Sequence, residues 1–438
     1  MFDLPKYGDG ICLARMAELL DMLAIDRARL RRISVVVTGS NGKGSTAAMC
    51  ARIGHAYGLR TGLFTSPHLF RFNERIQIDG VEIGDDAFAR LRGQVEAALA
   101  EVSTRRGEQF GGFEALFALA CLHFQKSGCD FAVFEAGIGG RYDPVRLVGA
   151  RGTCVTSVDY EHVELLGNSL ELIASDKSDA CAAAGTIIYG ESCRDLRRHL
   201  VEHNRWRGCT PLFVRDEITI DNEAQSASRQ HFDFQFGYHD FRSLELGLPG
   251  AFQFNNAAIA TTLFLLWLQH EQPRKDPERI ETAIRSGLRD ARWPGRLEVI
   301  QQDPLTVIDV GHTPDGIRQS LASLMAIHGA EDWILVTGAS RDKKADEIIG
   351  ALAPSFQTII CTAARHKGAD AQGIADAARR ANPEAEIHVT ASIQDAVRLA
   401  GELAEAKRRK IYVAGGLFLA IEYATVVKGD RAEDLTFF

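Results

Sequence analysis

The sequence of 438 residues lacks a surplus of basic residues. It carries 50 Lys and Arg against 58 Asp and Glu, a formal net charge of -8, whereas a general nucleic-acid binder usually shows a basic excess. Local basic groups, such as Arg31–Arg32 and Lys407–Lys410, are more typical of solvated helix ends. We therefore expect no nucleic-acid partner.

Cysteine pairs in C-x-x-C spacing are also missing. The nine cysteines are scattered and odd in number, and several lie in apolar runs, which indicates buried thiols. The first ten residues show no basic region followed by an apolar run, and the longest apolar stretch, residues 257–268, is too short to cross a bilayer. These absences predict a cytoplasmic protein with no membrane partner.

Tandem repeats and low-complexity tracts are absent too. What the sequence contains is an alternation of short apolar runs and longer helical patterns, which favours a mostly parallel sheet with helices on both faces. Strands are predicted at 34–39, 60–66, 131–137 and 153–158, and helices at 45–58 and 113–128. Residues 211–220 and 231–241 alternate apolar and polar side chains, which predicts antiparallel strands appended to this first domain.

A domain boundary is predicted near "RWPGRLEVI" (292–300), where Pro and Gly indicate a turn. Beyond it the α/β pattern restarts, with strands expected at 305–311, 332–340, 357–364, 385–391 and 410–416. We therefore predict an N-terminal domain over residues 1–297 and a C-terminal Rossmann-like α/β domain over residues 298–438.

The stretch "VVVTGSNGKGST" (35–46) has the features of a phosphate-binding loop between a strand and a helix. Glycines permit tight turns and close approach of the backbone to a ligand, and the N-terminus of the following helix favours an anion. Lys43 adds a positive charge for phosphates. The standard P-loop has Ser or Thr directly after the Lys, but Gly44 stands here, so the pattern departs from that motif.

Polar residues follow the other predicted strands at the same sheet edge, where ligands bind in open α/β folds. Glu135 ends a strand and is a candidate ligand for Mg²⁺, and Ser66 is a second one. In the C-terminal half, Asp309 and His312 follow a strand, and Arg296 lies at the domain junction, within reach of a nucleotide in the cleft. Taken singly, each of these residues is equally well explained as an ordinary loop residue.

The order of the motifs resembles that of the folylpolyglutamate synthases and dihydrofolate synthases, relatives of the Mur ligases. The resemblance runs through "VTGSNGKGST", "GLFTSPHLFRFNERIQIDG", "FEAGIGGRYD", "EHVELLGNSLELIASDK", "LPGAFQFNNAAIA", "RWPGRLE" and "DVGHTPDG". It implies a P-loop-type N-terminal domain and a chemistry in which ATP phosphorylates a carboxylate and the amine of an amino acid, glutamate in the folate enzymes, then displaces phosphate.

The resemblance also assigns roles. It implies catalytic roles for Lys43, His162 and Lys177. It implies that ATP is bound by Gly39, Asn41, Gly42, Lys43, Gly44, Ser45, Thr46, Asn256, Arg296, Asp309 and His312. One or two Mg²⁺ ions would be held by Ser66, Glu135, His162 and Lys177, the last as a carbamylated lysine. The carboxylate acceptor, a pteroate or folate, would meet His68, Arg75, Asp143 and Arg146. The oligomeric state is expected to be a monomer or a small homo-oligomer.

Several positions depart from the family pattern. The family usually has "GGRLDATN" where this chain has "GGRYDPVR", and Glu161 replaces the Asp that precedes the histidine. Arg146 adds a positive charge that suits an anionic group of the acceptor. Two alternatives therefore stand beside the folate enzyme: a paralogous amide ligase with another acceptor, and a non-catalytic nucleotide-binding protein.

Overall fold

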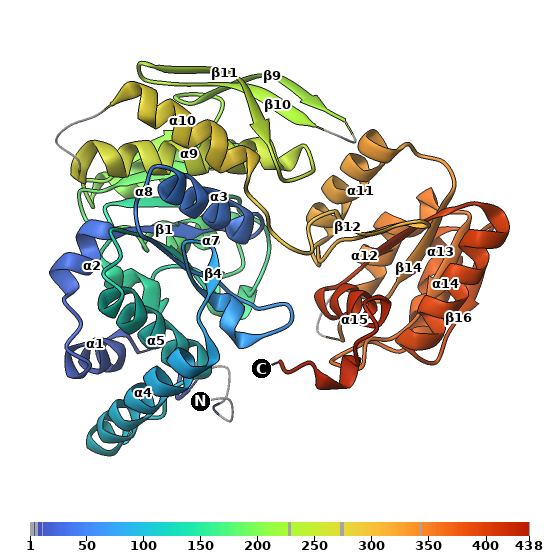
Figure 1. Cartoon of the computed structure of the whole chain (residues 1–438), viewed down its shortest axis with the longest axis horizontal. Coiled ribbons are helices and arrows are strands. Elements are labelled where there is room, and N and C mark those ends of the chain that lie inside the picture. Colours follow the sequence, from blue (N-terminus) through green and yellow to red (C-terminus); the bar gives the residue numbers. More distant parts are fainter. Residues whose placement is uncertain are drawn as a thin grey trace.

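The computed structural model describes residues 4, 8–10, 12–226, 229–271, 276–341 and 344–437. Within these ranges the strands form an eight-stranded sheet, a three-stranded sheet and a six-stranded sheet. Figure 1 shows two α/β bodies side by side, with the three-stranded sheet lying over helices of the first body. The predicted α/β class, with mostly parallel sheets and an appended antiparallel region, is confirmed.

The eight-stranded sheet has the order β4-β3-β2-β5-β1-β6-β7-β8. Its strands are β1 (Ser34–Thr38), β2 (Thr61–Phe64), β3 (Ile76–Ile78), β4 (Val81–Glu82), β5 (Phe131–Glu135), β6 (Gly152–Val155), β7 (Thr186–Tyr189) and β8 (Thr210–Phe213). β1 lies between β5 and β6 and is parallel to both. The carboxyl ends of β1, β2, β5 and β6 therefore meet at one edge, where the predicted site residues begin.

Helices cover both faces of this sheet because its central strands are buried on both sides. Val35 and Val37 pack into one core cluster and Val36 into the other, as the period of two requires. One face carries α3 (Lys43–Ala56), α9 (Phe252–Glu271) and α10 (Pro277–Arg289), and the other carries α1 (Leu13–Met22), α2 (Arg27–Ile33), α4 (Asp85–Arg106) and α5 (Gly112–Lys126). Three shorter helices, α6 (Val163–Leu166), α7 (Leu170–Ser178) and α8 (Arg197–Arg205), follow β6 and β7.

The appended sheet contains β9 (Thr219–Gln225), β10 (Gln230–Phe236) and β11 (His239–Leu246), all antiparallel. The antiparallel strand predicted over 231–241 is confirmed and forms β10 with the start of β11, but most of the one predicted over 211–220 is wrong, since only Thr219 and Ile220 lie in antiparallel β9. Thr210–Phe213 instead forms β8, which pairs in parallel with β7 at the edge of the large sheet. Alternating side chains indicate an extended backbone, but they do not specify which strand lies beside it.

The six-stranded sheet has the order β12-β13-β17-β14-β15-β16, with only β12 antiparallel to its neighbour among the described strands. Its strands are β12 (Glu298–Gln302), β13 (Leu305–Ile308), β14 (Trp333–Thr337), β15 (Thr358–Cys361), β16 (Glu386–Val389) and β17 (Lys410–Ala414). Its helices are α11 (Pro314–His328), α12 (Ala345–Leu352) and α13 (Ala371–Ala381) on one face and α14 (Ile393–Lys407) and α15 (Leu417–Val427) on the other. The boundary predicted after residue 297 stays a prediction.

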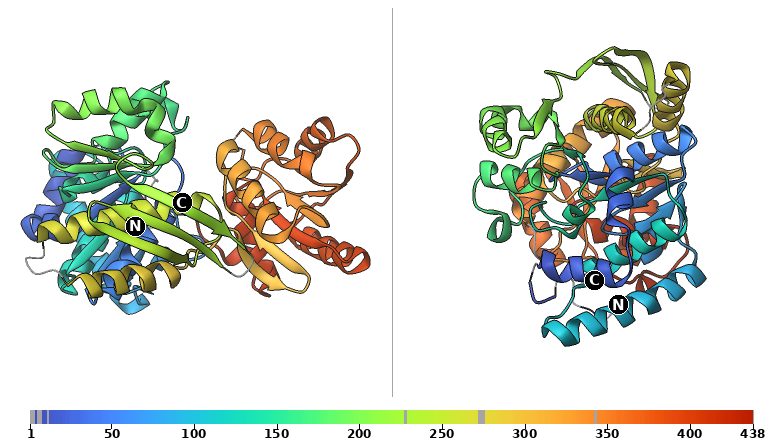
Figure 2. Two further views of the ribbon diagram at one scale, coloured as in Figure 1. Left: turned by 90° about the horizontal axis from the view of Figure 1, so that it is seen from above. Right: turned by 90° about the vertical axis from the view of Figure 1, so that its left-hand side faces the viewer.

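Short 3₁₀ turns complete the chain: η1 (Phe72–Arg75), η2 (Pro144–Val148), η3 (Glu191–Leu196), η4 (Ala353–Ser355) and η5 (Ala432–Asp434). None of the helices in the described ranges is long and apolar enough to cross a membrane. Figure 2 shows the two bodies from two further directions, with the six-stranded sheet and its helices in orange and red.

Candidate active site

Residues 39–44 connect β1 to α3 in a tight turn that only glycine fits at key positions. Gly42 has a φ of +84° and caps the N-terminus of α3, and a Cβ on Gly39 would lie 1.9 Å from Thr156 Oγ1. A Cβ on Gly44 would lie 2.7 Å from Nε1 of Trp293. The glycine that departs from the P-loop motif is therefore explained by close packing against the indole of Trp293.

The loop is held by the segment that follows β6. The N–H of Asn41 donates to Ser157 Oγ at 2.8 Å, and the hydroxyl of Thr156 donates to the Asn41 carbonyl at 2.5 Å. Ser40 Oγ also accepts from the N–H of Asp159 at 3.0 Å. These bonds hold the loop in its shape from outside.

Lys43 lies on the first turn of α3, and its ammonium bends back over the loop. Nζ donates to the carbonyl oxygens of Gly39 at 2.7 Å and Ser40 at 3.1 Å. The positive charge therefore lies beside the helix N-terminus, where the aligned peptide dipoles also favour an anion.

Three cations surround the buried carboxylate of Glu135, which is 3% exposed at the end of β5. Burial raises the pKa of Glu135 to about 7, against the opposing effects of Lys43, the Ser66 N–H, Arg296 and Arg75. The N–H of Ser66 donates to Glu135 Oε2 at 3.1 Å. Three distant parts of the sequence thus meet at this carboxylate.

A second buried pair lies beside the same loop. Lys177, on α7, is 1% exposed and donates from Nζ to Glu161 Oε1 at 2.6 Å. Burial alone would raise the pKa of Glu161, but the charges of Lys177 and Lys43 lower it to about 2. Burial also lowers the pKa of Lys177, against the attraction of Glu161. The adjacent His162 is exposed, with a φ of +45°, and begins α6.

The predicted adenine residue, Asn256, lies against the phosphate loop. It is 3% exposed on α9, and its Nδ2 donates to Gln253 Oε1 at 2.9 Å. A Cβ on Gly42 would lie 2.6 Å from Asn256 Oδ1. Gln253 in turn donates to Ser45 Oγ at 3.3 Å. Asn256 is therefore part of the packing around the loop. Thr46, on the first turn of α3, is fully buried as well.

The C-terminal half reaches the loop through residues 309–313. Thr313 Oγ1 donates to Asn41 Oδ1 at 3.2 Å, so the turn before α11 touches the phosphate loop directly. Asp309 is fully buried and accepts from the N–H groups of Gly311 and Leu297 at 2.8 and 3.2 Å. Burial raises the pKa of Asp309, and Arg296 opposes this effect.

His312 and Arg296 complete this part of the site. His312 Nδ1 lies 3.3 Å from the Val310 carbonyl. Arg296 is half-buried, and its charge acts on both Glu135 and Asp309. Arg296, at the junction between the two sheets, therefore acts on a buried carboxylate from each half of the chain.

The predicted acceptor loop is held by its own carboxylate. Asp143 is 5% exposed and accepts from the N–H groups of Gly137, Ile138 and Val145 at 2.9–3.0 Å. Burial raises the pKa of Asp143 to about 6 despite these bonds. Its oxygens fold the loop, and Asp143 is therefore better explained as a structural residue than as an acceptor ligand.

Arg146 and Arg141 extend the same loop towards α7. Arg146 Nη1 donates to the Arg141 carbonyl at 2.7 Å, and Arg141 Nε donates to Asp179 Oδ2 at 2.7 Å. Asp176 Oδ1 accepts from the N–H of Gly140 at 2.9 Å. The loop with the altered family pattern is thus bonded to the segment that contains Lys177.

His68 and Arg75 form a buried pair in the segment after β2. Arg75 Nε donates to His68 Nδ1 at 2.8 Å. Burial and the neighbouring Arg75 lower the pKa of His68 to about 3, although its bond to the Thr436 carbonyl opposes this. Burial likewise lowers the pKa of Arg75 to about 10, against the charges of Glu135 and Glu74. Both residues are too buried to lie on an open surface.

The structure brings together most of the predicted nucleotide and metal residues. The charges of Lys43 and Arg296 and the N–H of Ser66 act on Glu135, and the charges of Lys43 and Lys177 act on Glu161. Sequence reasoning missed Trp293, since nothing local links an indole to Gly44, and it noted Glu161 only as a departure from the family pattern, without its partner Lys177. Glu161 and Lys177 are 16 residues apart in the sequence, and this spacing matches no helix or strand period that would predict their contact.

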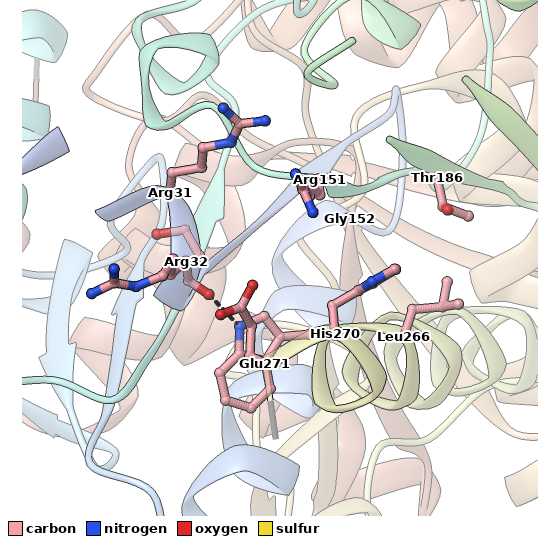
Figure 3. Close-up of a pocket in the computed structure, with 10 residues that line it drawn as sticks. Arg31, Arg32, Arg151, Gly152, Thr186, Leu266, His270 and Glu271 are labelled. Atoms are coloured by element: carbon pink, nitrogen blue, oxygen red, sulfur yellow. Dashed lines mark hydrogen bonds between the residues drawn. The ribbon is translucent and has the colours of Figure 1, made fainter. Parts of the chain in front are cut away.

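The small cavity in Figure 3 lies at the other end of the sheet. Its lining includes Ser34, Gly152 and Thr186, which begin β1, β6 and β7, together with Arg31 and Arg151. Trp267 Nε1 donates to the Arg32 carbonyl at its base at 2.8 Å. Because the phosphate loop follows the carboxyl end of β1, this cavity is separate from the candidate site.

Comparison with known proteins adds four likenesses. Residues 295–416 match the family model "Mur ligase, glutamate ligase domain". The dihydrofolate synthase/folylpolyglutamate synthase of Bacillus subtilis (strain 168) is 31% identical over 350 residues, covering 79% of this chain and 80% of the relative. The Mycobacterium tuberculosis folylpolyglutamate synthase complexed with ADP and AMPPCP superposes with a TM-score of 0.86 at 25% identity, over 95% of each chain. An FPGS–AMPPCP–folate complex gives a TM-score of 0.82 at 27% identity, over 97% of each chain.

Proposed function

The chain belongs to the family of folylpolyglutamate synthases and dihydrofolate synthases, and on that premise we propose that it is an ATP-dependent ligase that joins glutamate to a folate-type acceptor. The observation that carries the proposal is the group of Lys43, Arg296 and Arg75 around the buried Glu135 beside a preformed phosphate loop. Phosphoryl transfer needs charge neutralisation and positioning more than covalent help from the protein, and this arrangement supplies both.

The nucleotide is proposed to lie along the loop at the carboxyl edge of the large sheet. The N–H groups of Gly42, Gly44 and Ser45 and the ammonium of Lys43 would hold its phosphates, with Asn256 on the adenine side. Arg296, Asp309 and His312 would contact it from the other half of the chain. The bond between Thr313 and Asn41 supports this arrangement because it joins the two halves at the loop.

The residues present fit Mg²⁺, which prefers oxygen ligands and keeps several waters and substrate phosphates in its shell. Ser66 and Glu135 would hold the first ion, since their bond places a hydroxyl-bearing residue beside a carboxylate. Within the described ranges no group of three or more His, Cys, Asp or Glu side chains is arranged to hold a metal ion. When bound, Mg²⁺ neutralises phosphate charge.

A second ion would involve Glu135, His162 and Lys177, the last as a carbamate. Carbamylation turns the ammonium into an anion, so Lys177 would first lose its proton and its bond to Glu161. The burial that lowers the pKa of Lys177 supports the proton loss. Addition of ¹³C-bicarbonate should give a carbamate NMR signal that is absent in Lys177→Ala; no signal in the active protein would refute the modification.

The acceptor carboxylate is proposed to attack the γ-phosphorus, forming an acyl phosphate and releasing ADP. The amine of glutamate then attacks the acyl carbon, phosphate leaves, and an amide remains. His68, Arg75 and Arg146 would orient the acceptor. The buried cations near Glu135 would stabilise the negative charge that develops during both steps.

The test is an ATP-dependent phosphate-release assay over pteroate, folates and unrelated carboxylic acids, each paired with several amino acids. Product masses identify the amide formed. Turnover of a pterin acceptor with glutamate supports the proposal. Turnover of another acid with no pterin turnover would favour a paralogous ligase, and no phosphate release with any pair of carboxylic acid and amino acid would favour a non-catalytic nucleotide-binding protein.

A further inference from the structure

The chain crosses from one body to the other a second time after α15. α15 packs on the six-stranded sheet, and Leu435 and Phe437 still pack against its core cluster. Figure 1 shows the end marked C between the two bodies, beside the light-blue segment that follows β2. Residues 435–437, here named the strap, therefore connect the C-terminal body with the segment that follows β2 in the N-terminal body.

Two strap residues contact the His68 ring: Thr436 at the ring edge and Phe437 at the ring face. His68 Nε2 lies 2.8 Å from the Thr436 carbonyl, and the rings of His68 and Phe437 are stacked at 6.0 Å with an interplanar angle of 3°. Since Arg75 Nε donates to Nδ1, Nδ1 accepts and the proton lies on Nε2, which donates to Thr436. Arg75 and Thr436 thus hold the two ring nitrogens of His68 from opposite sides, and the strap supplies one of these two bonds.

The other side of the strap is anchored to the C-terminal body. The Phe437 ring packs against Phe418 at 4.8 Å and His366 at 4.9 Å. The Glu433 carbonyl, just before the strap, accepts from Arg365 Nη1 at 3.2 Å. The strap therefore moves with the C-terminal body and reaches His68 as part of it.

The segment after β2 is held by the same body at two further points. Lys428 Nζ lies 4.7 Å from the centre of the Phe70 ring, and Leu69 and Phe70 pack against the core cluster of the six-stranded sheet. The same segment contains Ser66, whose N–H is bonded to Glu135. A shift of the C-terminal body is thus transmitted to residues beside the phosphate loop.

We propose that the strap positions the His68–Arg75 pair for the acceptor when the two bodies close on the substrates. The inference rests on the proposed ligase function. Phe437 and Thr436 contact His68 and the C-terminal body, so they act as positioning residues through His68. A misplaced orienting group weakens binding of the molecule it orients, which here is the acceptor and not ATP.

The first experiment measures KM for the acceptor and for ATP separately in the full chain. Phe437→Ala and deletion of residues 435–438 should raise the acceptor KM about tenfold or more and leave the ATP KM within about twofold. Phe437→Tyr, which keeps the stacked ring, should restore the acceptor KM. Tyr238→Ala removes a ring that is 77% exposed on the β10–β11 hairpin and serves as the matched control, with no change expected.

An unchanged acceptor KM in the deletion variant, a parallel rise in both KM values, or an increase in activity would overturn the proposal. The second experiment reads the His68 imidazole by ¹⁵N NMR. Wild type should show the proton on Nε2, and the deletion variant should lose this pattern; identical spectra would overturn the proposal. If wild type turns over no folate acceptor, the ligase assignment fails, and the NMR result alone decides whether the strap positions His68.

Discussion

The nucleotide side of the candidate site and the outer surface beside its loop at residues 140–146 differ in burial. On the nucleotide side, Glu135 is 3% exposed and Lys177 is 1% exposed, and hydrogen bonds fix the phosphate loop from behind. Beside the loop that departs from the family pattern, Tyr142 is 52%, Tyr160 55% and Leu165 58% exposed, although the predicted acceptor residues His68, Arg75 and Asp143 are themselves buried. Buried charges have a fixed geometry and suit a constant chemistry, whereas exposed side chains can change with the acceptor while the fold is retained. The strongest effects should therefore come from the buried side.

Lys43→Ala should have the largest effect. It removes the ammonium that lies over the loop, and loss of one group that stabilises developing charge lowers kcat by about 10²–10³. Phosphate release with saturating ATP measures this. Lys407→Ala, a surface change in a pair with Glu386, is the control. A loss of less than tenfold in Lys43→Ala would remove the contrast between the two sides.

Glu135→Gln should lower kcat by about 10² and at the same time stabilise the fold at pH 8. The pKa of Glu135 is raised from 4.5 to about 7, so the fold favours the protonated form; stability is lost as the pH rises from about 4.5 to about 7, and the loss is complete at pH 8. Because the amide in Glu135→Gln carries no charge, the variant avoids this loss, and its free energy of unfolding at pH 8 should rise by up to about 3 kcal/mol. Urea denaturation at pH 8 measures the gain; a destabilised variant would contradict it.

Glu161→Gln should destabilise the fold because it leaves Lys177 buried without a charged partner. Removing one member of a buried ion pair costs about 3 kcal/mol. The double variant Glu161→Gln/Lys177→Met should recover most of this loss in a denaturation experiment. If the two changes simply add, the pair is not coupled. The exposed pair Arg398–Glu402 supplies the matched control, for which about 0.5 kcal/mol or less is expected.

The pH dependence of catalysis should follow Glu135. Because its pKa is raised to about 7, the carboxylate is present above that pH and is lost as the pH falls through it. Apparent affinity for Mg²⁺ should weaken by up to about tenfold per pH unit below 7. Titration of activity with Mg²⁺ at pH 6, 7 and 8 measures this. An affinity that does not change with pH would place the cation elsewhere.

Arg146→Ala should have the smallest effect of these changes. Its bond to the Arg141 carbonyl leaves other guanidinium N–H groups for an anion, and exposed charges contribute about 1 kcal/mol or less. We expect the acceptor KM to rise about fivefold, with the ATP KM unchanged. Arg194→Ala, in a surface pair with Asp216, is the control. An unchanged acceptor KM would show that Arg146 does not meet the acceptor.

The sequence by itself determined the α/β class, the strand–loop–helix around residues 34–56 and most of the nucleotide-side residues. These features depend on local rules: apolar periodicity, glycine where the backbone turns tightly, and polar residues at strand ends. Parallel strands end at one edge, so residues such as Ser66 and Glu135 meet without any knowledge of long-range pairing.

Only the tertiary structure decided the rest. Gly44 is required because the Trp293 indole packs on it, Glu161 in the loop before α6 pairs with Lys177 on α7, and Thr436 meets His68 although 368 residues separate them. Asp143 also turned inward to fold its own loop. Contacts of this kind depend on how sheets and helices pack, and a local pattern contains no information about the partner.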